Sequence, residues 1–406
     1  MKKPIDICPE SEHDSIPMTR PSRPGIYPST AYVCDNPELA NAILAGESPG
    51  YAYQRDGHPN SDMLGNKCAK LHHHPSLNED VLGTVTSSGM AALTLALVAY
   101  LKSGDHVLLS NRLYGKTTSL VAGQLSRFGI ESGEADCCDL VEFEAAVRDN
   151  TKMIIVETIS NPQMRVADIE SISKIAKAND ALLLVDNTFA TPIVCQPLKH
   201  GADLVLESLS KFMNGHGDLM LGFLCGRKSI WQGLDGLGLN AISSTWGLAS
   251  APFDCWLAER GVATLAVRML HASRTAESVA KFLEQHPAVR TTNYPGSPSH
   301  LDREISLRQF ELVGERTCFA NLLSFDLQQI EWAERLIRNV EIPFCPSLGE
   351  AATTLSHPGS TSHRTLNEQQ LAALAISHGT IRLSIGLESA ETLISQLKLG
   401  LDGLDS

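Results

Sequence analysis

The sequence lacks the features that mark membrane, secreted and nucleic-acid-binding proteins. Its longest apolar stretch, Met90 to Leu101, is too short to cross a bilayer. The segment Met1 to Met18 mixes Asp, Glu, His and Pro without the apolar core of a signal peptide. Basic residues are in deficit, since 33 Lys and Arg against 46 Asp and Glu leave a formal net charge of -13. Because phosphate backbones bind clustered cations, this charge argues against a nucleic-acid partner. The missing membrane span and signal peptide lead us to expect a cytoplasmic protein with no membrane partner.

The cysteines also lack the spacing of a disulfide or metal framework. Ten cysteines are spread through 406 residues without a C-x-x-C pair. Cys137 and Cys138 are adjacent, which suits neither a bridge nor a zinc knuckle. We expect reduced, mostly buried thiols and no metal site.

The length and the apolar pattern predict an α/β fold with a second, smaller domain. Residues 1–60 are rich in Pro, Ser and Gly and predict an extended arm that contacts a neighbouring subunit. In residues 61–252 short apolar runs alternate with helical segments, which indicates a mostly parallel sheet sandwiched by helices. Residues 253–406 predict an α+β domain that opens with one long helix or a kinked pair. The expected strands of the larger domain are His106–Ser110, Met153–Glu157, Ala181–Asp186, Asp203–Glu207 and Leu221–Cys225.

Polar groups follow several of these strands, where open α/β sheets place their ligands. The small residues Ser87–Met90 precede an apolar helix and suit a phosphate, although a plain helix cap explains them equally well. Asp186 ends a strand and is a candidate partner for a cationic ring nitrogen, or part of a simple turn. Neither motif decides the function by itself.

Two further residues make the pattern more specific. Lys211 follows a buried strand in Ser208-Leu209-Ser210-Lys211, so that two hydroxyls flank a lysine that could form an imine. Arg382 lies inside an apolar strand and needs an anion, either a substrate carboxylate or a structural salt bridge. Together the four pieces match the needs of a pyridoxal 5'-phosphate (PLP) enzyme that acts on an amino acid.

In these motifs the chain resembles the Cys/Met metabolism PLP-dependent enzymes. That family includes cystathionine γ-synthases, cystathionine and methionine γ-lyases, and homoserine sulfhydrylases. The resemblance extends from about Ala52 almost to the C-terminus. The motifs that carry it are Ser88-Gly89-Met90-Ala91-Ala92, Leu113-Tyr114-Gly115, Ser160-Asn161-Pro162, Val185–Pro192, Gly201-Ala202-Asp203, Ser208–Lys211, Arg260–Leu265, Ser347-Leu348-Gly349 and Arg382–Glu388. It implies fold type I of the PLP-dependent transferases, which is aspartate-aminotransferase-like, and a homo-oligomer built as a dimer of dimers.

The resemblance also implies roles for individual residues. Lys211 holds PLP as a Schiff base and then moves protons, Asp186 keeps the ring nitrogen protonated, Asn161 faces the ring oxygen, and Tyr114 stacks on the ring and serves as acid or base. The implied phosphate and cofactor contacts are Gly89, Met90, Ser208, Ser210, Thr188 and, from the neighbouring subunit, Tyr53 and Arg55. The implied substrate contacts are Arg382, Ser347 and Tyr114.

Several positions depart from the family pattern. Gly217 replaces a common Ser, and His72-His73-His74 stands where a Glu-Gly loop is usual. We interpret the three histidines as a solvated loop, because contiguous residues of a regular element cannot all face one ion. Lys116 replaces the Cys of methionine γ-lyases and suggests an acidic or acylated substrate side chain. Pro346 stands where cystathionine enzymes carry Glu for the distal amino group.

The resulting hypothesis is a carbon-sulfur lyase that carries out γ- or β-elimination on cystathionine, methionine or cysteine. The alternative within the family is a γ-replacement transferase, either an O-acylhomoserine sulfhydrylase or a cystathionine γ-synthase. The alternative from another class is a PLP-binding regulatory protein without turnover.

Overall fold

A seven-stranded sheet forms the centre of the larger part of the molecule. The computed structural model describes residues 22–234, 236–313, 316–364 and 366–404. Within them the strand order is β1-β7-β6-β5-β4-β2-β3. The strands are β1 (Val81–Thr86), β2 (His106–Ser110), β3 (Glu131–Ala135), β4 (Thr151–Glu157), β5 (Leu182–Asp186), β6 (Leu204–Glu207) and β7 (Gly222–Arg227). β7 runs antiparallel to both neighbours, and the remaining pairings are parallel. The expected α/β fold with a mostly parallel sheet is therefore confirmed.

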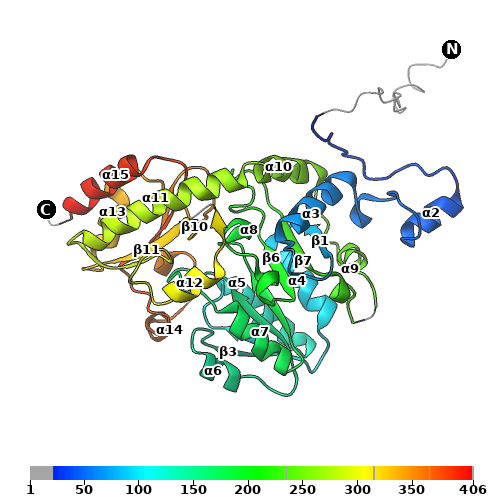
Figure 1. Cartoon of the computed structure of the whole chain (residues 1–406), viewed down its shortest axis with the longest axis horizontal. Coiled ribbons are helices and arrows are strands. Elements are labelled where there is room, and N and C mark those ends of the chain that lie inside the picture. The colour runs from blue at the N-terminus through cyan, green and yellow to red at the C-terminus, as the bar shows by residue number, and fades with distance from the viewer. Residues whose placement is uncertain (1–21, 235, 314–315, 365, 405–406) are drawn as a thin grey trace, which may run out of the picture.

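Both faces of this sheet are buried, which explains why its central strands are continuously apolar. Successive side chains point to opposite faces, so Leu108 and Leu109 in β2 belong to two different core clusters. α4 (Gly89–Tyr100) packs on the face of Leu109. α3 (Pro59–His72) and α7 (Ile169–Ala178) contribute to the cluster of Leu108. Figure 1 shows this layered arrangement in the lower right half of the molecule.

The C-terminal part contains a second, antiparallel sheet. Its order is β12-β13-β11-β8, formed by β8 (Val289–Asn293), β11 (Leu322–Leu327), β12 (Thr354–Ser356) and β13 (Thr380–Ser384). β9 (Leu312–Val313) and β10 (Arg316–Thr317) form a separate short pair. The helical region after residue 251 is a pair, α10 (Pro252–Val262) and α11 (Leu265–Gln285), as the pattern predicted. The other helices are α2 (Pro37–Leu44), α5 (Gly115–Thr118), α6 (Leu140–Ala145), α8 (Thr191–Val194), α9 (Leu239–Thr245), α12 (Arg303–Gln309), α13 (Trp332–Asn339), α14 (Glu368–Ala373) and α15 (Ala390–Asp402).

The N-terminal segment matches the expected arm only in part. Residues 1–21 lie outside the described residues. Beyond them the segment contains α2, which Asn36 caps by accepting from the backbone N–H of Leu39, and Figure 1 shows α2 standing apart from the body. We propose the division at residues 60 and 252, because all strands of the seven-stranded sheet fall within 61–252 and all strands of the second sheet after it.

The interpretation of His72-His73-His74 as a solvated loop is wrong for His72. This residue is the last of α3, is fully buried and stacks against Phe223 with ring centroids 6.1 Å apart. Its Nε2 lies 3.4 Å from Oε1 of Glu207, and burial lowers the pKa of the imidazole to about 3. His73 is exposed. The three side chains therefore divide between the core and the surface.

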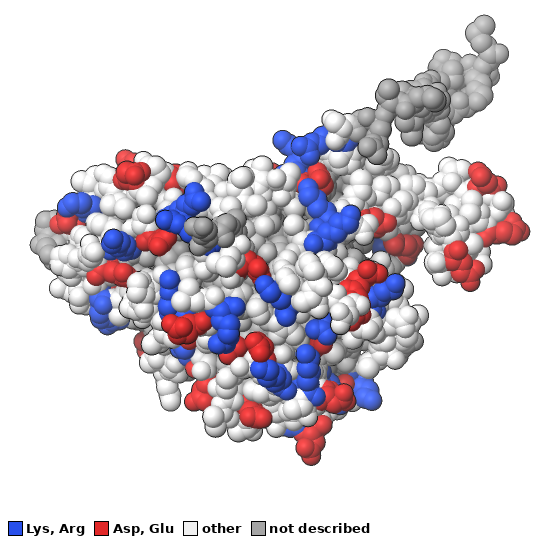
Figure 2. Space-filling view, viewed as in Figure 1, with Lys and Arg blue, Asp and Glu red and all other residues white. Residues whose placement is uncertain are grey.

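Surface charge is mixed in sign. On the face drawn in Figure 2, Lys and Arg alternate with Asp and Glu, and no broad basic area is visible. Within the described ranges, no helix is both long and apolar enough to span a bilayer.

Gly222 offers a test of the packing between β7 and the start of α4. A Cβ atom at this position would lie 2.1 Å from the carbonyl oxygen of Ser88. We predict that Gly222→Ala lowers the free energy of unfolding by about 1–3 kcal/mol, because backbone must move to admit the methyl group. Urea unfolding of the holoenzyme measures the change. Gly123→Ala is the matched control, since no atom lies within 4 Å of its Cβ position; equal midpoints for the two variants would contradict the packing.

Candidate functional site

One large cavity lies at the carboxyl ends of β4, β5 and β6. Its volume is about 550 Å³. Parallel strands end at the same edge of a sheet, so residues far apart in sequence meet there. Loops of the second sheet complete the cavity through Pro346, Ser347 and Arg382. The expected site residues that line it are Gly89, Met90, Tyr114, Asn161, Asp186, Thr188, Ser208, Ser210, Lys211, Ser347 and Arg382.

One side of the cavity has the form of an anion cradle. The N-terminus of α4 points into it, and Ser88 caps the helix by accepting from the backbone N–H of Ala91 at 3.1 Å. A Cβ on Gly89 would lie 3.0 Å from the Ser208 Cβ, so a larger residue would require Ser208 to shift. The Ser208 hydroxyl makes no hydrogen bond to any described residue, whereas Ser210 Oγ bonds both backbone groups of Leu221. The free N–H groups and the free hydroxyl suit a phosphate.

Two carboxyl groups lie side by side at the ends of neighbouring strands. Glu157 and Asp186 are partners in the register of β4 and β5. Burial raises the pKa of Asp186, and burial together with the Asp186 carboxylate raises the pKa of Glu157 well above its usual value. Asp186 Oδ1 accepts from the Thr188 N–H at 3.0 Å, and Thr188 Oγ1 accepts from the Ser208 N–H at 2.8 Å. This chain of bonds fixes Asp186 relative to the anion cradle.

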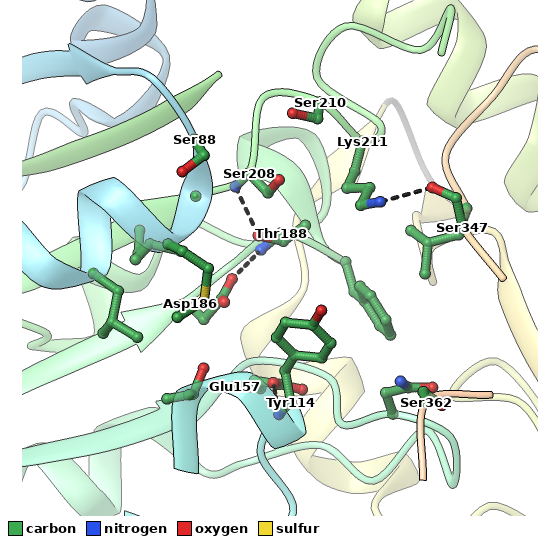
Figure 3. Close-up of a pocket in the computed structure, with 18 of the residues that line it drawn as sticks. Ser88, Tyr114, Glu157, Asp186, Thr188, Ser208, Ser210, Lys211, Ser347 and Ser362 are labelled. Atoms are coloured by element: carbon green, nitrogen blue, oxygen red, sulfur yellow. Dashed lines mark hydrogen bonds between the residues drawn. The ribbon is translucent and has the colours of Figure 1, made fainter. Parts of the chain in front are cut away.

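Lys211 reaches from the loop after β6 toward the second sheet. Its Nζ donates to Ser347 Oγ at 2.7 Å, as Figure 3 shows. Burial lowers the pKa of Lys211, and the nearby Arg382 guanidinium lowers it further. A lysine with a depressed pKa is more often neutral, which is the form that attacks a carbonyl.

The turn after Lys211 is anchored from the long helix α11. Arg268 is buried and donates to the carbonyl oxygens of Phe212 at 2.8 Å, Met213 at 3.0 Å and Gly261 at 2.8 Å. Burial lowers the pKa of Arg268 to about 10. Because the guanidinium holds the two residues that follow Lys211, it limits the movement of the lysine backbone.

Arg382 is a buried cation without an acidic partner among the described residues. It is 3% exposed, and burial lowers its pKa to about 10. Its Nη1 donates to Asn161 Oδ1 at 3.0 Å and its Nη2 to the Ser347 carbonyl at 3.3 Å, while Nε has no partner. The alternative of a structural salt bridge is therefore not realised in the described part of the chain. An anion that enters the cavity would satisfy the guanidinium.

Tyr114 lines the cavity across from Ser208 and Ser210. Figure 3 shows its ring on the opposite side of the cavity from these two serines. Its backbone N–H donates to Glu157 Oε1 at 2.6 Å, and its side chain remains 43% exposed. Glu157 is a cavity residue that the sequence motifs did not include. Its position at the end of an expected strand, beside the one that ends in Asp186, could have identified it.

Three expected residues lie away from this cavity. Tyr53 and Arg55 pack on each other, with the Arg55 guanidinium carbon 5.3 Å from the ring centroid. Neither of them lines the cavity that contains Lys211. Lys116 is exposed on α5 and does not line the cavity either, so its suggested effect on the substrate stays a prediction from the sequence.

The residues present fit PLP. The anion cradle matches a phosphate, Asp186 matches a protonated ring nitrogen, and Lys211 can bind the aldehyde carbon. The orphaned Nε of Arg382 then remains for the carboxylate of an amino acid. All of these groups face one space of about 550 Å³, which is within the range of small-molecule sites.

Comparisons with known proteins agree with this arrangement. The L-methionine gamma-lyase of Porphyromonas gingivalis is 36% identical over 382 residues, which cover 93% of this chain and 92% of that protein. The cystathionine beta-lyase of Bacillus subtilis is 36% identical over 348 residues, which cover 86% and 85%. A Campylobacter jejuni protein assigned as an O-acetylhomoserine (thiol)-lyase has a similar structure, with a TM-score of 0.86, 36% identity and coverage of 94% and 95%. That structure contains N'-pyridoxyl-lysine-5'-monophosphate.

The model of one protein family matches nearly the whole chain. It is the family described as Cys/Met metabolism PLP-dependent enzyme, and the match spans residues 7–402. The family and the relatives are enzymes, which supports an enzyme over a PLP-binding regulatory protein. The chain therefore belongs to the Cys/Met metabolism PLP-dependent enzymes, and its cofactor is PLP.

Proposed function

We propose that the protein eliminates a thiol from Cγ or Cβ of a sulfur-containing amino acid such as cystathionine, methionine or cysteine. The observation that carries this proposal is the pairing of Lys211 and Arg382 across one cavity, bridged by Ser347. Lysine serves the amino end of the substrate, and the guanidinium without an acidic partner serves its carboxylate. The lyases among the relatives act on substrates of this class.

Each cavity residue has a proposed task. PLP supplies an electron sink that makes the protons of a bound amino acid removable. Lys211 Nζ binds the cofactor and afterwards accepts the Cα proton, for which its lowered pKa is suited. Asp186 holds a proton at the ring nitrogen, and Asn161 orients both the ring oxygen and Arg382, to which it is hydrogen-bonded. Tyr114 covers the ring and exchanges a proton with the leaving sulfur.

The cofactor phosphate is assigned to the cradle at α4. We propose that the backbone N–H groups of Gly89 and Met90 and the hydroxyls of Ser208 and Ser210 would bind it, and that Thr188 would also contact the cofactor. Ser210 would exchange its bond to Leu221 for one to the phosphate. Ser347 would release Lys211 and contribute to the binding of the substrate carboxylate with Arg382.

A homo-oligomer completes the proposed site. Tyr53 and Arg55 lie outside the cavity of their own chain and would contact the phosphate bound by a neighbouring subunit. We propose a dimer on this basis, and the family resemblance implies that two such dimers pair. The cytoplasmic location stays a prediction from the sequence.

A γ-replacement transferase is the second candidate. The similarity to the O-acetylhomoserine (thiol)-lyase of Campylobacter jejuni favours it, because such an enzyme binds the same amino-acid portion and adds a sulfur nucleophile. Elimination and replacement share every step up to the departure of the leaving group and differ in the fate of the remaining carbon chain.

A substrate panel separates the two candidates. We expect methionine, cystathionine or cysteine to give 2-oxobutyrate or pyruvate together with ammonia in the absence of any added thiol. O-acetylhomoserine with sulfide should give little homocysteine. The reverse pattern would establish the transferase, and no product from any of these substrates would contradict both.

Lys211→Ala tests the covalent anchor. We predict loss of the visible absorbance of lysine-bound cofactor and a decrease in kcat of at least about 100-fold, the usual contribution of a positioned acid-base group. Lys174→Ala is the control, because this lysine is exposed on α7 and pairs with Glu170. Wild-type turnover by Lys211→Ala would refute the assignment.

Arg382→Lys tests the carboxylate clamp. Lysine retains the charge but not the two-pronged geometry, so we predict a decrease in kcat/KM of about 10- to 100-fold, mostly through KM. Steady-state kinetics measure it, with the exposed Arg338→Lys as the control. An unchanged KM would indicate that the carboxylate binds elsewhere.

A further inference from the structure

A third acid, Glu350, lines the same cavity and has no task in the proposed mechanism. It directly follows the turn Ser347-Leu348-Gly349, which packs on the backbone of Lys211. A Cβ on Gly349 would lie 2.7 Å from both the Lys211 carbonyl carbon and the Phe212 nitrogen, and the φ of Gly349 is +91°. Only glycine permits this approach. The position of Glu350 is therefore tied to the position of Lys211.

Two hydrogen bonds fix this turn from either side. Ser347 Oγ accepts from Lys211 Nζ at 2.7 Å, and the Gly349 N–H donates to Ser384 Oγ at 3.1 Å. Ser384 belongs to β13, which also carries Arg382. Glu350 is consequently held between the element with the lysine and the element with the arginine.

The Glu350 carboxyl group occupies space that a side chain at position 217 would need. A Cβ on Gly217 would be 2.8 Å from Cδ and 2.9 Å from Oε1 of Glu350. Gly217 also lines the cavity, and its φ of +67° favours glycine. The common serine of the family could not stand at position 217 with Glu350 in this place. The glycine at position 217 therefore makes room for the Glu350 carboxylate.

The Glu350 carboxylate forms no hydrogen bond and no ion pair within the described part of the chain, and the residue is half-buried. Its charge acts through space on the ammonium group of Lys211. Among the nearby cations, Lys211 donates to Ser347 and Arg382 to Asn161 and Ser347. Once Lys211 binds the cofactor, its ammonium charge is no longer available to Glu350. An anionic group then faces the space of the substrate, beside the neutral Pro346.

We propose that Glu350 determines substrate specificity by binding a cationic group at the far end of the substrate side chain. The substrate class is a 2-amino acid whose departing thiol carries an ammonium group. Tails that end in a carboxylate, such as a succinyl ester, are disfavoured by repulsion. This inference rests on the proposed elimination, because it concerns the group attached to the leaving sulfur.

The turnover experiment compares three thioethers of homocysteine that differ only in the charge of the tail. They are S-(2-aminoethyl)-, S-propyl- and S-(2-carboxyethyl)-homocysteine. Each consumes one water and yields one thiol, 2-oxobutyrate and ammonia after the Cγ–S bond breaks, so one assay serves all three. The matching S-substituted cysteines, which yield pyruvate, cover elimination from Cβ.

In the wild-type holoenzyme we expect kcat/KM for the aminoethyl compound to exceed that for the propyl compound by about 10- to 100-fold, the range of a charge-assisted hydrogen bond. The carboxyethyl compound should be the poorest. In Glu350→Gln the aminoethyl-to-propyl ratio should fall to within about threefold of unity, because the amide lacks the charge. Since these are ratios, they do not depend on the fraction of folded enzyme. Glu334→Gln, on the exposed face of α13, should keep the wild-type ratio.

Gly217→Ala provides a second variant at the same contact. The added Cβ must displace the Glu350 carboxylate, so the aminoethyl-to-propyl ratio should fall although Glu350 itself is intact. A wild-type enzyme without preference for the aminoethyl compound would overturn the inference. A preference that survives in both Glu350→Gln and Gly217→Ala would overturn it as well.

A binding experiment separates failure of this inference from failure of the proposed function. Lysine, norleucine and 2-aminoadipate have similar length and no leaving group, and calorimetry on the holoenzyme gives their affinities. We expect lysine to bind most tightly in the wild type and to lose this advantage in Glu350→Gln. If no thioether turns over but lysine keeps its Glu350-dependent advantage, the elimination is wrong and the specificity stands. Equal affinities alongside active turnover refute the specificity alone.

Discussion

The site depends on the parallel pairing of β4, β5 and β6. Parallel strands point their carboxyl ends the same way, so the residues that end each strand meet at one edge without any long loop. This pairing places Glu157 beside Asp186 and brings the loop with Ser208 and Lys211 to the same place. The antiparallel β7 closes the arrangement, because Gly222 allows it to pass the carbonyl of Ser88 at the start of α4.

The charges of the cavity are arranged so that each end of an amino acid meets a different kind of group. Arg382 is held by neutral oxygens of Asn161 and Ser347, so its charge is available to a ligand. Asp186 accepts a hydrogen bond from the Thr188 N–H. This bond lowers the pKa of the Asp186 carboxyl group, but burial raises it by more. Buried polar groups without partners reduce stability, and a ligand that satisfies them would offset that cost.

The sequence was sufficient for what depends on local pattern. Buried strands such as β5 and β6 consist of apolar runs that end in an acid, and the motifs around Lys211 and Asp186 are contiguous. β3 was missed because this edge strand, Glu131–Ala135, is mostly solvent-accessible and therefore has no apolar signature. β1 was missed because Gly83 and two threonines interrupt its apolar pattern, and α9 because the helix is short and follows a glycine-rich stretch.

Other features depend on contacts between distant positions and could not be predicted from local pattern. The burial of His72 depends on Glu207 and Phe223, which come more than a hundred residues later. The position of the Glu350 carboxylate depends on a glycine at position 217, which only the fold brings next to it. Lys116 directly follows Tyr114-Gly115, and this local pattern suggested a residue that affects the substrate. In the fold, however, Lys116 lies at the start of α5 and is exposed to solvent.

Lys211 lies on the loop after β6 and Arg382 on β13 of the second sheet, and this separation has a stereochemical consequence. A substrate held through its amino nitrogen on the side of Lys211 and through its carboxylate by Arg382 can rotate only about the line that joins these two points. Its Cα hydrogen and its side chain must then lie on opposite sides of that line. Only one mirror image directs the hydrogen toward Lys211 while the side chain extends into open space. The handedness of the accepted amino acid would thus follow from the relative placement of Lys211 and Arg382 rather than from any single contact.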